Sequence, residues 1–298
     1  MINFYLQYEY WFAANQLIFA MLGMGATLAL KDFHEVIAEP KSFSLGISTQ
    51  LFAVPLVAFF FVYFGCFTAS LTIGIALIAA IPGGTISNIF AHLAKGNTPL
   101  SISITAITTI GCLLTTPFIL NVLVAEYLPQ NFSMPVGKIA LEIGVYLLMP
   151  LVLGMGVFRY LPKIAKIFAR WCVRVSLLII VFIVLGSLSA GRLNLAIFGS
   201  QNILILVCFF LALAAVGHLI PRLLSLNQAD RVAIEMEVVV RNVNLGLLIN
   251  ASLFPATSTE FAATGNMVLL ALLLFGSMQF ILGVVLITIN RRKANRST

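Results

Sequence analysis

Apolar segments long enough to cross a membrane follow one another along almost the whole chain. The 298 residues are 61% hydrophobic and only 9% charged, which is far outside the composition of a soluble globular domain. A hydrocarbon layer about 30 Å thick requires roughly 20 apolar residues per spanning helix. We therefore predict an all-α polytopic membrane protein, with short polar connections and no inserted soluble domain.

About nine segments meet this length criterion. Residues 1–10 contain no Lys or Arg, so we expect the first segment to be retained rather than cleaved as a signal peptide. The predicted spans are 11–30, 43–64, 68–93, 100–128, 136–160, 175–190, 203–224, 229–254 and 262–290.

The basic residues divide unequally between alternate connections, and they resist translocation when they lie near cytoplasmic ends. A cytoplasmic C-terminus and an outside N-terminus leave only Lys138 and Arg192 on the outer side, with Arg241 inside a span. The net charge of +7 therefore reports topology rather than nucleic-acid binding. The predicted cytoplasmic set is Lys31, Lys41, Lys95, Arg159, Lys163, Lys166, Arg170, Arg174, Arg222, Arg231, Arg291, Arg292, Lys293 and Arg296.

The second to fourth spans and the seventh to ninth spans look like two copies of one three-helix unit. In each copy the middle helix is the most polar of the three. The first copy enters from the cytoplasm and the second from outside, so the copies have inverted topology, as in many secondary transporters.

The third span is interrupted by the sequence Pro-Gly-Gly-Thr-Ile-Ser-Asn at 82–88. Proline removes a hydrogen-bond donor and the two glycines favour non-helical backbone, so we expect the helix to unwind there. A simple proline kink is the alternative. Unwound backbone at membrane depth is tolerated where it lines a cavity or is buried in protein, and its carbonyls and half-helix ends can bind ions.

The eighth span holds Glu237, Arg241, Asn242 and Asn244 at the position equivalent to this break. A charged side chain costs roughly 2.5 to 3.5 kcal/mol at the centre of an inserted helix, so the cluster must have partners. Glu237 and Arg241 are four residues apart and can pair on one helical face. Such a pair does not explain the two asparagines. Glu235 is expected to face water near the cytoplasmic end.

The fourth span contributes hydroxyl groups, and those of Ser101 and Thr105 share one helical face. Serine and threonine in membrane helices often bond their own backbone or pack against neighbours. If they face Asn88 and Glu237, they complete an oxygen cage for a hard monovalent cation. We predict that the two interrupted helices cross at this cage.

The remaining polar and reactive residues indicate no second site. Lys138 and Glu142 have the spacing of an interfacial ion pair. His218 has no acid at a spacing suited to a proton relay, so we expect it to pack or to lie at the interface. The cysteines are far apart and should be packing residues: Cys66, Cys112, Cys172 and Cys208.

These motifs resemble those of the bile acid:sodium symporter family, solute carrier family 10. The resemblance rests on residues 82–88, on Ala-Lys-Gly-Asn at 94–97, and on Leu-Ser at 100–101, Glu237 and Asn242, and it extends over roughly 11–290. It implies a core domain of inverted repeats at 43–128 and 202–290 and a panel domain at 1–42 and 129–201. Residues 291–298 form a cytoplasmic tail.

The resemblance also implies two sodium sites. The first uses Ser87, Asn88, Ser101, Thr105 and Glu237. The second uses Gln50, Glu237, backbone carbonyls near Val238 and Val240, and a glutamine where this chain has Arg241.

A guanidinium group has donors and no acceptor, so Arg241 cannot be a sodium ligand. We hypothesise that it replaces the second sodium, neutralising Glu237 while Gln50 accepts a hydrogen bond from it. Alternatively, Arg241 holds a substrate carboxylate.

The family transports organic anions, from sterol conjugates to small carboxylates such as pantoate or pyruvate. The half-helix N-terminus at the break offers a positive dipole to an anion. The candidate substrate contacts are Thr85, Asn242, Asn244 and Gln279. We expect a monomer in the inner (plasma) membrane of a bacterium.

Three other functions fit the sequence less well. A proton antiporter usually needs two titrating acids at the crossing, and only Glu237 is well placed. An intramembrane enzyme lacks candidate residues, because the chain has no H-E-x-x-H, no G-x-S-x-G and no paired aspartates within the spans. A sodium-independent facilitator or exchanger of the same fold remains the closest alternative, because of Arg241.

Overall fold

The computed structural model describes residues 2–29, 40–65, 67–128 and 133–294, and this part of the chain is helical, with no strand. Six of its helices are long and apolar enough to cross a membrane, and two shorter apolar helices accompany them. The predicted class, an all-α polytopic membrane protein, is therefore confirmed. The count of nine spans and the orientation stay predictions. The described helices are α1 (Ile2–Gly25), α3 (Pro40–Ser48), α4 (Val54–Gly65), α5 (Ala69–Ala80), α6 (Thr85–Leu93), α7 (Thr98–Val124), α8 (Val136–Glu142), α9 (Met149–Tyr160), α10 (Pro162–Ser189), α11 (Leu195–Phe198), α12 (Ser200–Leu223), α13 (Gln228–Val239), α14 (Val243–Leu253) and α15 (Ala262–Ala294).

Several of these helices are joined end to end. A π-helical turn, Thr49–Ala53, joins α3 to α4, and a second, Ile143–Leu148, joins α8 to α9. Each set therefore forms one long spanning element, 40–65 and 136–160.

Two elements differ from their predicted bounds. The first predicted span, 11–30, is instead α1, Ile2–Gly25, and it is not among the six long apolar helices. One of its buried polar residues has a hydrogen-bond partner on α10, because Gln16 donates to Ser176 at 3.1 Å. The sixth predicted span, 175–190, is the second half of α10, which begins earlier because Pro162 suits the first turn of a helix.

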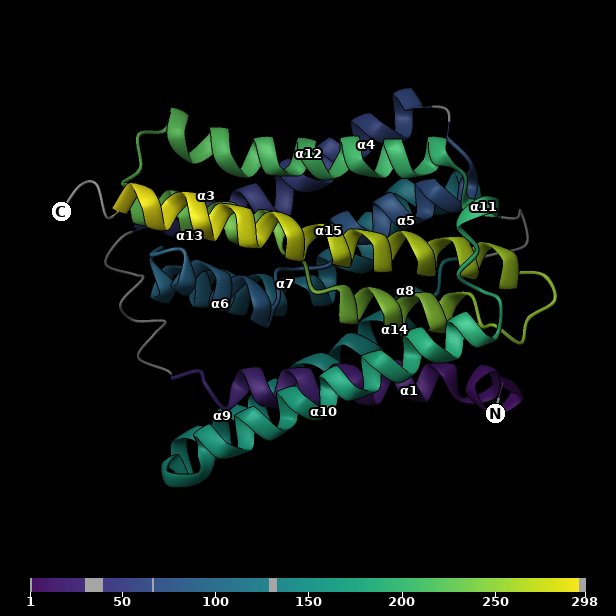
Figure 1. Ribbon diagram of the computed structural model, residues 1–298, viewed down its shortest axis with the longest axis horizontal. Coiled ribbons are helices and arrows are strands. Elements are labelled where there is room, and N and C mark those ends of the chain that lie inside the picture. Colours follow the sequence, from purple (N-terminus) through teal and green to yellow (C-terminus); the bar gives the residue numbers. More distant parts are fainter. Residues whose placement is uncertain (1, 30–39, 66, 129–132, 295–298) are drawn as a thin grey trace.

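The two three-helix units are visible in the structure. Each consists of a long helix, a broken helix and another long helix. The first unit contains residues 40–65, the broken helix α5–α6 and α7. The second contains α12, the broken helix α13–α14 and α15. In Figure 1 the path from α5 to α6 runs opposite to the path from α13 to α14, as an inverted repeat requires.

A separate layer of α1, α9 and α10 lies along the bottom of Figure 1. Close approach of two backbones holds α1 against α9: a Cβ added at Gly25 would lie 2.1 Å from the Leu151 carbonyl oxygen, and one at Gly154 would lie 2.4 Å from that of Leu22. Small residues at helix contacts are typical of membrane proteins. This layer corresponds to much of the predicted panel domain, whose boundaries stay a prediction.

Near one end of the molecule, polar contacts of α8, which continues into α9, join this side of the molecule to the inverted repeats. The predicted pair Lys138–Glu142 forms at 3.9 Å. The buried Glu142 carboxylate also accepts a hydrogen bond from Ser252 of α14 at 2.7 Å.

A second contact at the same end involves Arg192, which follows α10. It pairs with Glu9 of α1 at 2.5 Å and donates from Nε to Asn266 of α15, also at 2.5 Å. Arg192 was predicted to lie on the outer side, and its side chain is buried rather than in contact with water.

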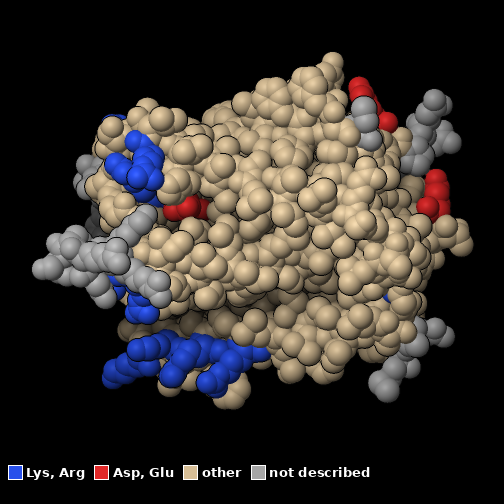
Figure 2. All heavy atoms as spheres, turned by 45° about the horizontal axis from the view of Figure 1, so that its top comes forward, with Lys and Arg blue, Asp and Glu red and all other residues tan. Residues whose placement is uncertain are grey.

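Figure 2 shows Lys and Arg side chains gathered at the end where α15 finishes, while acidic side chains are prominent at the opposite end. This distribution favours the predicted cytoplasmic C-terminus. The cysteine prediction was partly wrong: Cys112 and Cys172 are buried, but Cys208 is exposed on α12, and Cys66 lies outside the described residues.

Candidate functional site

The two broken helices cross where their helical hydrogen bonding stops. Between α5 and α6 the backbone is extended at Ile81, as expected for a residue before proline. Gly83 and Arg241 form an antiparallel backbone bridge, and the backbone amide of Asn242 donates to the Pro82 carbonyl at 2.8 Å. The predicted break, placed at 82–88, and the predicted crossing are both present, although the backbone is non-helical only at 81–84 and α6 begins at Thr85.

Four helix ends therefore meet at the crossing: the C-termini of α5 and α13 and the N-termini of α6 and α14. Helix N-termini carry partial positive charge and C-termini partial negative charge. The crossing thus presents groups that attract ions of either sign. Because residues 79–84 and 238–243 are buried, the partial charges there are less screened than at a surface.

The Glu237 carboxylate is the centre of the crossing and is fully buried. Its Oε1 accepts hydrogen bonds from Ser87 at 2.5 Å and Ser101 at 2.7 Å. Its Oε2 accepts from Thr105 at 2.7 Å and from Gln50 Nε2 at 3.1 Å. Three different elements, the π-helical turn Thr49–Ala53, α6 and α7, thus supply donors to one carboxylate.

Asn88 completes the same cluster. Its Oδ1 lies 2.8 Å from the Ser101 hydroxyl oxygen and 3.1 Å from that of Thr105. Each hydroxyl has one hydrogen and two acceptor lone pairs, so it donates either to Asn88 or to Glu237 and its lone pairs can face a cation. The structure brings together all five residues predicted for the first ion site, and their donor set is entirely oxygen.

The space around Gly83 explains why the motif has a glycine at this position. A Cβ at Gly83 would lie 2.3 Å from Glu237 Oε2 and 3.1 Å from Gln50 Nε2. The carboxylate therefore occupies the space that any side chain at this position would need.

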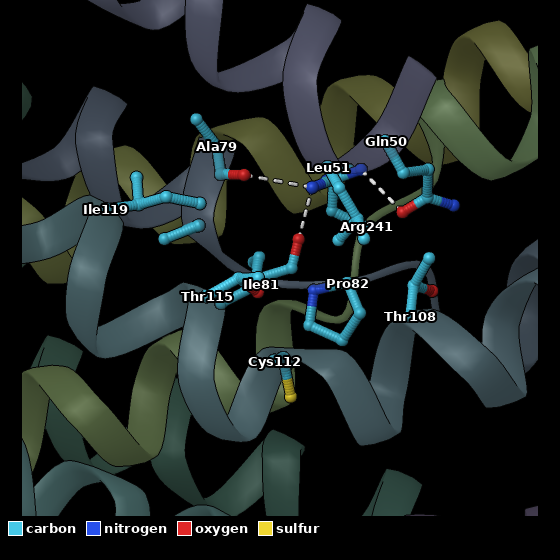
Figure 3. Close-up of a pocket in the computed structure, with 11 residues that line it drawn as sticks. Gln50, Leu51, Ala79, Ile81, Pro82, Thr108, Cys112, Thr115, Ile119 and Arg241 are labelled. Carbon is cyan, nitrogen blue, oxygen red and sulfur yellow. Dashed lines mark hydrogen bonds between the residues drawn. The ribbon is translucent and has the colours of Figure 1, made fainter. Parts of the chain in front are cut away.

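Arg241 is buried next to the crossing, and its guanidinium lies against the C-terminus of α5 (Figure 3). Nη1 donates to Gln50 Oε1 at 3.0 Å, and Nη2 donates to the carbonyl oxygens of Ala79, at 3.0 Å, and Ile81. Cations are favourable at this end of a helix, where carbonyls lack partners. Arg241 thus satisfies carbonyls that the break leaves free.

Glu237 and Arg241 do not form the intrahelical pair that their spacing allows. Helix α13 ends at Val239, so the four-residue spacing no longer places the two side chains on one helical face. Gln50 lies between them instead: its Nε2 donates to Glu237 and its Oε1 accepts from Arg241. The predicted acceptance by Gln50 is therefore present.

The orientation of Gln50 is fixed by its own contacts. Nε2 also donates to the Glu237 carbonyl at 3.2 Å, and Oε1 accepts from the Gly83 amide at 3.2 Å. Gln50 belongs to the π-helical turn Thr49–Ala53, and such turns are frequent at functional sites. No pattern in the sequence predicts that turn.

The predicted substrate contacts do not form one group. Thr85 and Asn244 are partly exposed at the N-terminal turns of α6 and α14. Asn242 is buried, with its amide 3.8 Å from the sulfur of Met21 on α1. Gln279 is buried and accepts a hydrogen bond from the Arg241 backbone amide at 2.9 Å. The contact of Asn242 with Met21 was not predicted from the sequence.

A small cavity lies beside Arg241, lined by α5, α7 and Gln50 (Figure 3). Its volume of about 10 Å³ is at the lower limit for one water molecule. Ligand pockets for organic molecules are far larger, roughly 300 to 1,000 Å³. This cavity is therefore too small to hold an organic carboxylate.

The expectation that Glu235 faces water was wrong, and His218 has an acid partner that its sequence spacing did not indicate. Glu235 is buried rather than water-facing, and its carboxylate lies 3.1 Å from His218 Nδ1. Arg222 Nη1 lies 3.0 Å from the other ring nitrogen. The acid and the histidine are on different helices, so their sequence spacing gave no signal.

A crossing of two discontinuous membrane helices between inverted repeats is a feature of many secondary transporters. The sequence matches the Sodium Bile acid symporter family over residues 14–198, which is more than half of the chain. The protein therefore belongs to this family. Its members are transporters, so the protein is a transporter and not an enzyme.

Three relatives illustrate the similarity. The uncharacterized sodium-dependent transporter YocS of Bacillus subtilis (strain 168) is 31% identical over 242 residues, covering 80% of this chain and 73% of that protein. The probable sodium/metabolite cotransporter BASS2, chloroplastic, of Oryza sativa subsp. japonica is 25% identical, covering 78% and 54%. The sodium-dependent organic anion transporter of Bos taurus is 28% identical, covering 69% and 53%. The chain thus spans about half the length of the last two.

We predict that Gly83→Ala destabilises the protein, because the new methyl group must displace the Glu237 carboxylate or the backbone of the crossing. Overpacking of this kind costs about 1 to 3 kcal/mol. Thermal unfolding in detergent measures the effect. Gly111→Ala in α7 is the control, since its nearest neighbour is 4.0 Å away, and equal melting temperatures for the two variants would contradict the steric argument.

Proposed function

We propose that the protein is a sodium-coupled symporter of an organic anion that works by alternating access, with one sodium bound per cycle. The observation that carries this proposal is the oxygen cluster around Glu237. One buried carboxylate, one amide oxygen and three hydroxyls converge there from three helices, α6, α7 and α13.

The charge of this cluster suits a monovalent cation. Glu237 is its only acid, and the other four ligands, Ser87, Asn88, Ser101 and Thr105, are neutral. Hard cations prefer such oxygen donors. A bound sodium would satisfy the carboxylate that three hydroxyls and Gln50 now satisfy by hydrogen bonds, so binding exchanges one set of contacts for another at low cost.

Arg241 takes the place of a second cation in this proposal. Its guanidinium is buried, it contacts the carbonyls at the end of α5, and it is joined to Glu237 through Gln50. Those are the contacts that a bound cation beside Gln50 would make. The adjoining cavity is too small for an organic anion, which favours this role over direct substrate binding.

The substrate anion would bind at the N-termini of α6 and α14. Thr85 and Asn244 are the partly exposed polar residues there, and helix N-termini favour anions. Asn242 and Gln279 would support this site from behind, because both are buried. The substrate class is an organic anion, either bile-acid-like or a small carboxylate such as pantoate or a keto acid.

Alternating access would move the core, 43–128 and 202–290, relative to the panel, 1–42 and 129–201. Figure 2 shows the surface hollowed between the lower layer and the rest of the molecule at the basic end. At the other end, Glu142–Ser252 and Arg192–Asn266 join the two parts. These contacts would hold the outer side closed and would break when it opens. We propose that the transporter acts as a monomer in the bacterial inner membrane.

A sodium-independent facilitator or exchanger of organic anions is the second candidate. The observation that favours it is Arg241, which already supplies a positive charge beside Glu237. Sodium dependence of uptake distinguishes the two functions.

We predict sodium-dependent uptake of at least one organic anion in a screen of small carboxylates and bile acids in proteoliposomes. Thr105→Val removes one ligand hydroxyl while keeping the shape, so it should weaken the apparent sodium affinity about tenfold or more. Thr109→Val is the matched control one turn along α7, because the Thr109 hydroxyl is buried without a hydrogen-bond partner. Uptake that does not depend on sodium would contradict the symporter and support the sodium-independent facilitator or exchanger.

A second variant tests the stoichiometry. Arg241→Gln replaces the fixed charge by a side chain with an acceptor oxygen, so a second sodium could bind beside Gln50. We expect the Hill coefficient for sodium to rise from about one toward two, the upper limit for transport that needs two bound sodium ions. An unchanged coefficient together with unchanged sodium dependence would contradict the replacement of a sodium by Arg241.

A further inference from the structure

The end of α9 and the first turns of α10 carry a concentration of positive charge that the transport site does not use. The charged residues are Arg159, Lys163, Lys166, Arg170 and Arg174, all of them exposed. No acidic residue occurs anywhere between 143 and 229. Among the described residues, none of these cations takes part in an ion pair. Their charge is therefore uncompensated within this part of the chain.

The cations of α10 lie on one face of the helix. Lys163, Lys166, Arg170 and Arg174 are spaced by three, four and four residues, which aligns their side chains in a stripe. A different face, with Ala165, Ala169, Cys172 and Ser176, is buried. The basic stripe therefore points away from the helices on which α10 packs.

A third face of the same helix segment is apolar and exposed. Ile164, Ile167 and Trp171 are 50%, 51% and 59% exposed, and their spacing of three and four residues also forms a stripe. An exposed apolar face beside a basic face is the pattern of a helix segment in the membrane interface.

The length of α10 places this segment at the level of the lipid headgroups. Its 28 residues extend about 42 Å at 1.5 Å per residue, whereas the hydrocarbon layer is about 30 Å thick. Trp171 and Tyr160, aromatic residues typical of the interface, mark the depth, and the Arg174 guanidinium lies 5.2 Å from the Trp171 ring centroid. In Figure 1 the α9–α10 turn projects at the lower left, beyond the rest of that layer.

We propose that the basic stripe of α10, Lys163, Lys166, Arg170 and Arg174, is a binding surface for the headgroup phosphates of anionic phospholipids. Basic residues near the membrane surface attract such lipids, and the neighbouring apolar stripe contacts their acyl chains. A soluble anion would use only the cations. The combination of the two stripes therefore favours a lipid.

The test compares two double variants that have the same net charge. Lys166→Gln with Arg170→Gln removes the middle of the stripe, and Lys95→Gln with Arg291→Gln removes two exposed cations elsewhere. Each protein, purified in neutral detergent, is titrated with phosphatidylglycerol or phosphatidylcholine, and bound lipid is counted by native mass spectrometry. Thermal unfolding is followed in parallel.

We expect the unsubstituted protein and the Lys95/Arg291 variant to bind phosphatidylglycerol in preference to phosphatidylcholine and to melt at a higher temperature with it. The Lys166/Arg170 variant should bind phosphatidylglycerol at least tenfold more weakly, since each cation contributes severalfold. The charge-conserving exchange Lys166→Arg with Arg170→Lys should restore binding, which shows that the effect is not misfolding.

Three results would overturn the proposal. Equal phosphatidylglycerol binding by the two glutamine variants would show that the stripe has no special role. Equal stabilisation by inorganic phosphate without lipid would show a site for soluble anions. Loss of phosphatidylglycerol binding by the Lys166/Arg170 variant that the charge-conserving exchange does not restore would show a structural effect. None of these measurements depends on transport.

Discussion

The hydrogen bonds of one buried glutamine connect the two opposite charges at the centre of this protein. Gln50 donates to Glu237 and accepts from Arg241, so an anion and a cation that make no direct contact share one neutral partner. Burying either charge alone would cost several kcal/mol. The broken helices depend on the same residues, because Arg241 contacts the carbonyls left free at the end of α5 and Glu237 occupies the space beside Gly83. The crossing is stable because its charges and its unwound backbone satisfy one another.

The main features of the fold and much of the site could be predicted from the sequence, because they depend on strong local signals. Long apolar segments require a membrane helix, and Pro-Gly-Gly in the middle of one requires a break. The five oxygen-bearing residues assigned to an ion site do converge. Their assignment came from resemblance to a family together with helical spacing. That they hold sodium is a proposal, and the structure adds the geometry on which it rests.

Other features could not be predicted, because they depend on contacts between residues far apart in the sequence. The spacing of Glu237 and Arg241 suggested a helical pair, but the helix ends between them. His218 and Glu235 meet across two helices. Spacing within one segment says nothing about either arrangement. The beginning of α10 was misplaced for a different reason: hydropathy detects the part of a helix in hydrocarbon, and the basic residues of its first turns lie outside that criterion.

The fixed charge of Arg241 also has a consequence for the energetics of a transport cycle. An empty site that contains Glu237 and Arg241 has no net charge, and a site loaded with one sodium and one monovalent anion has none either. Moving one elementary charge across a membrane involves about 2.3 kcal/mol per 100 mV, and under the proposed stoichiometry neither half of the cycle moves one. Such a carrier would respond to the sodium concentration gradient and not to the membrane voltage, and its accumulation ratio for the anion could not exceed the concentration ratio of sodium.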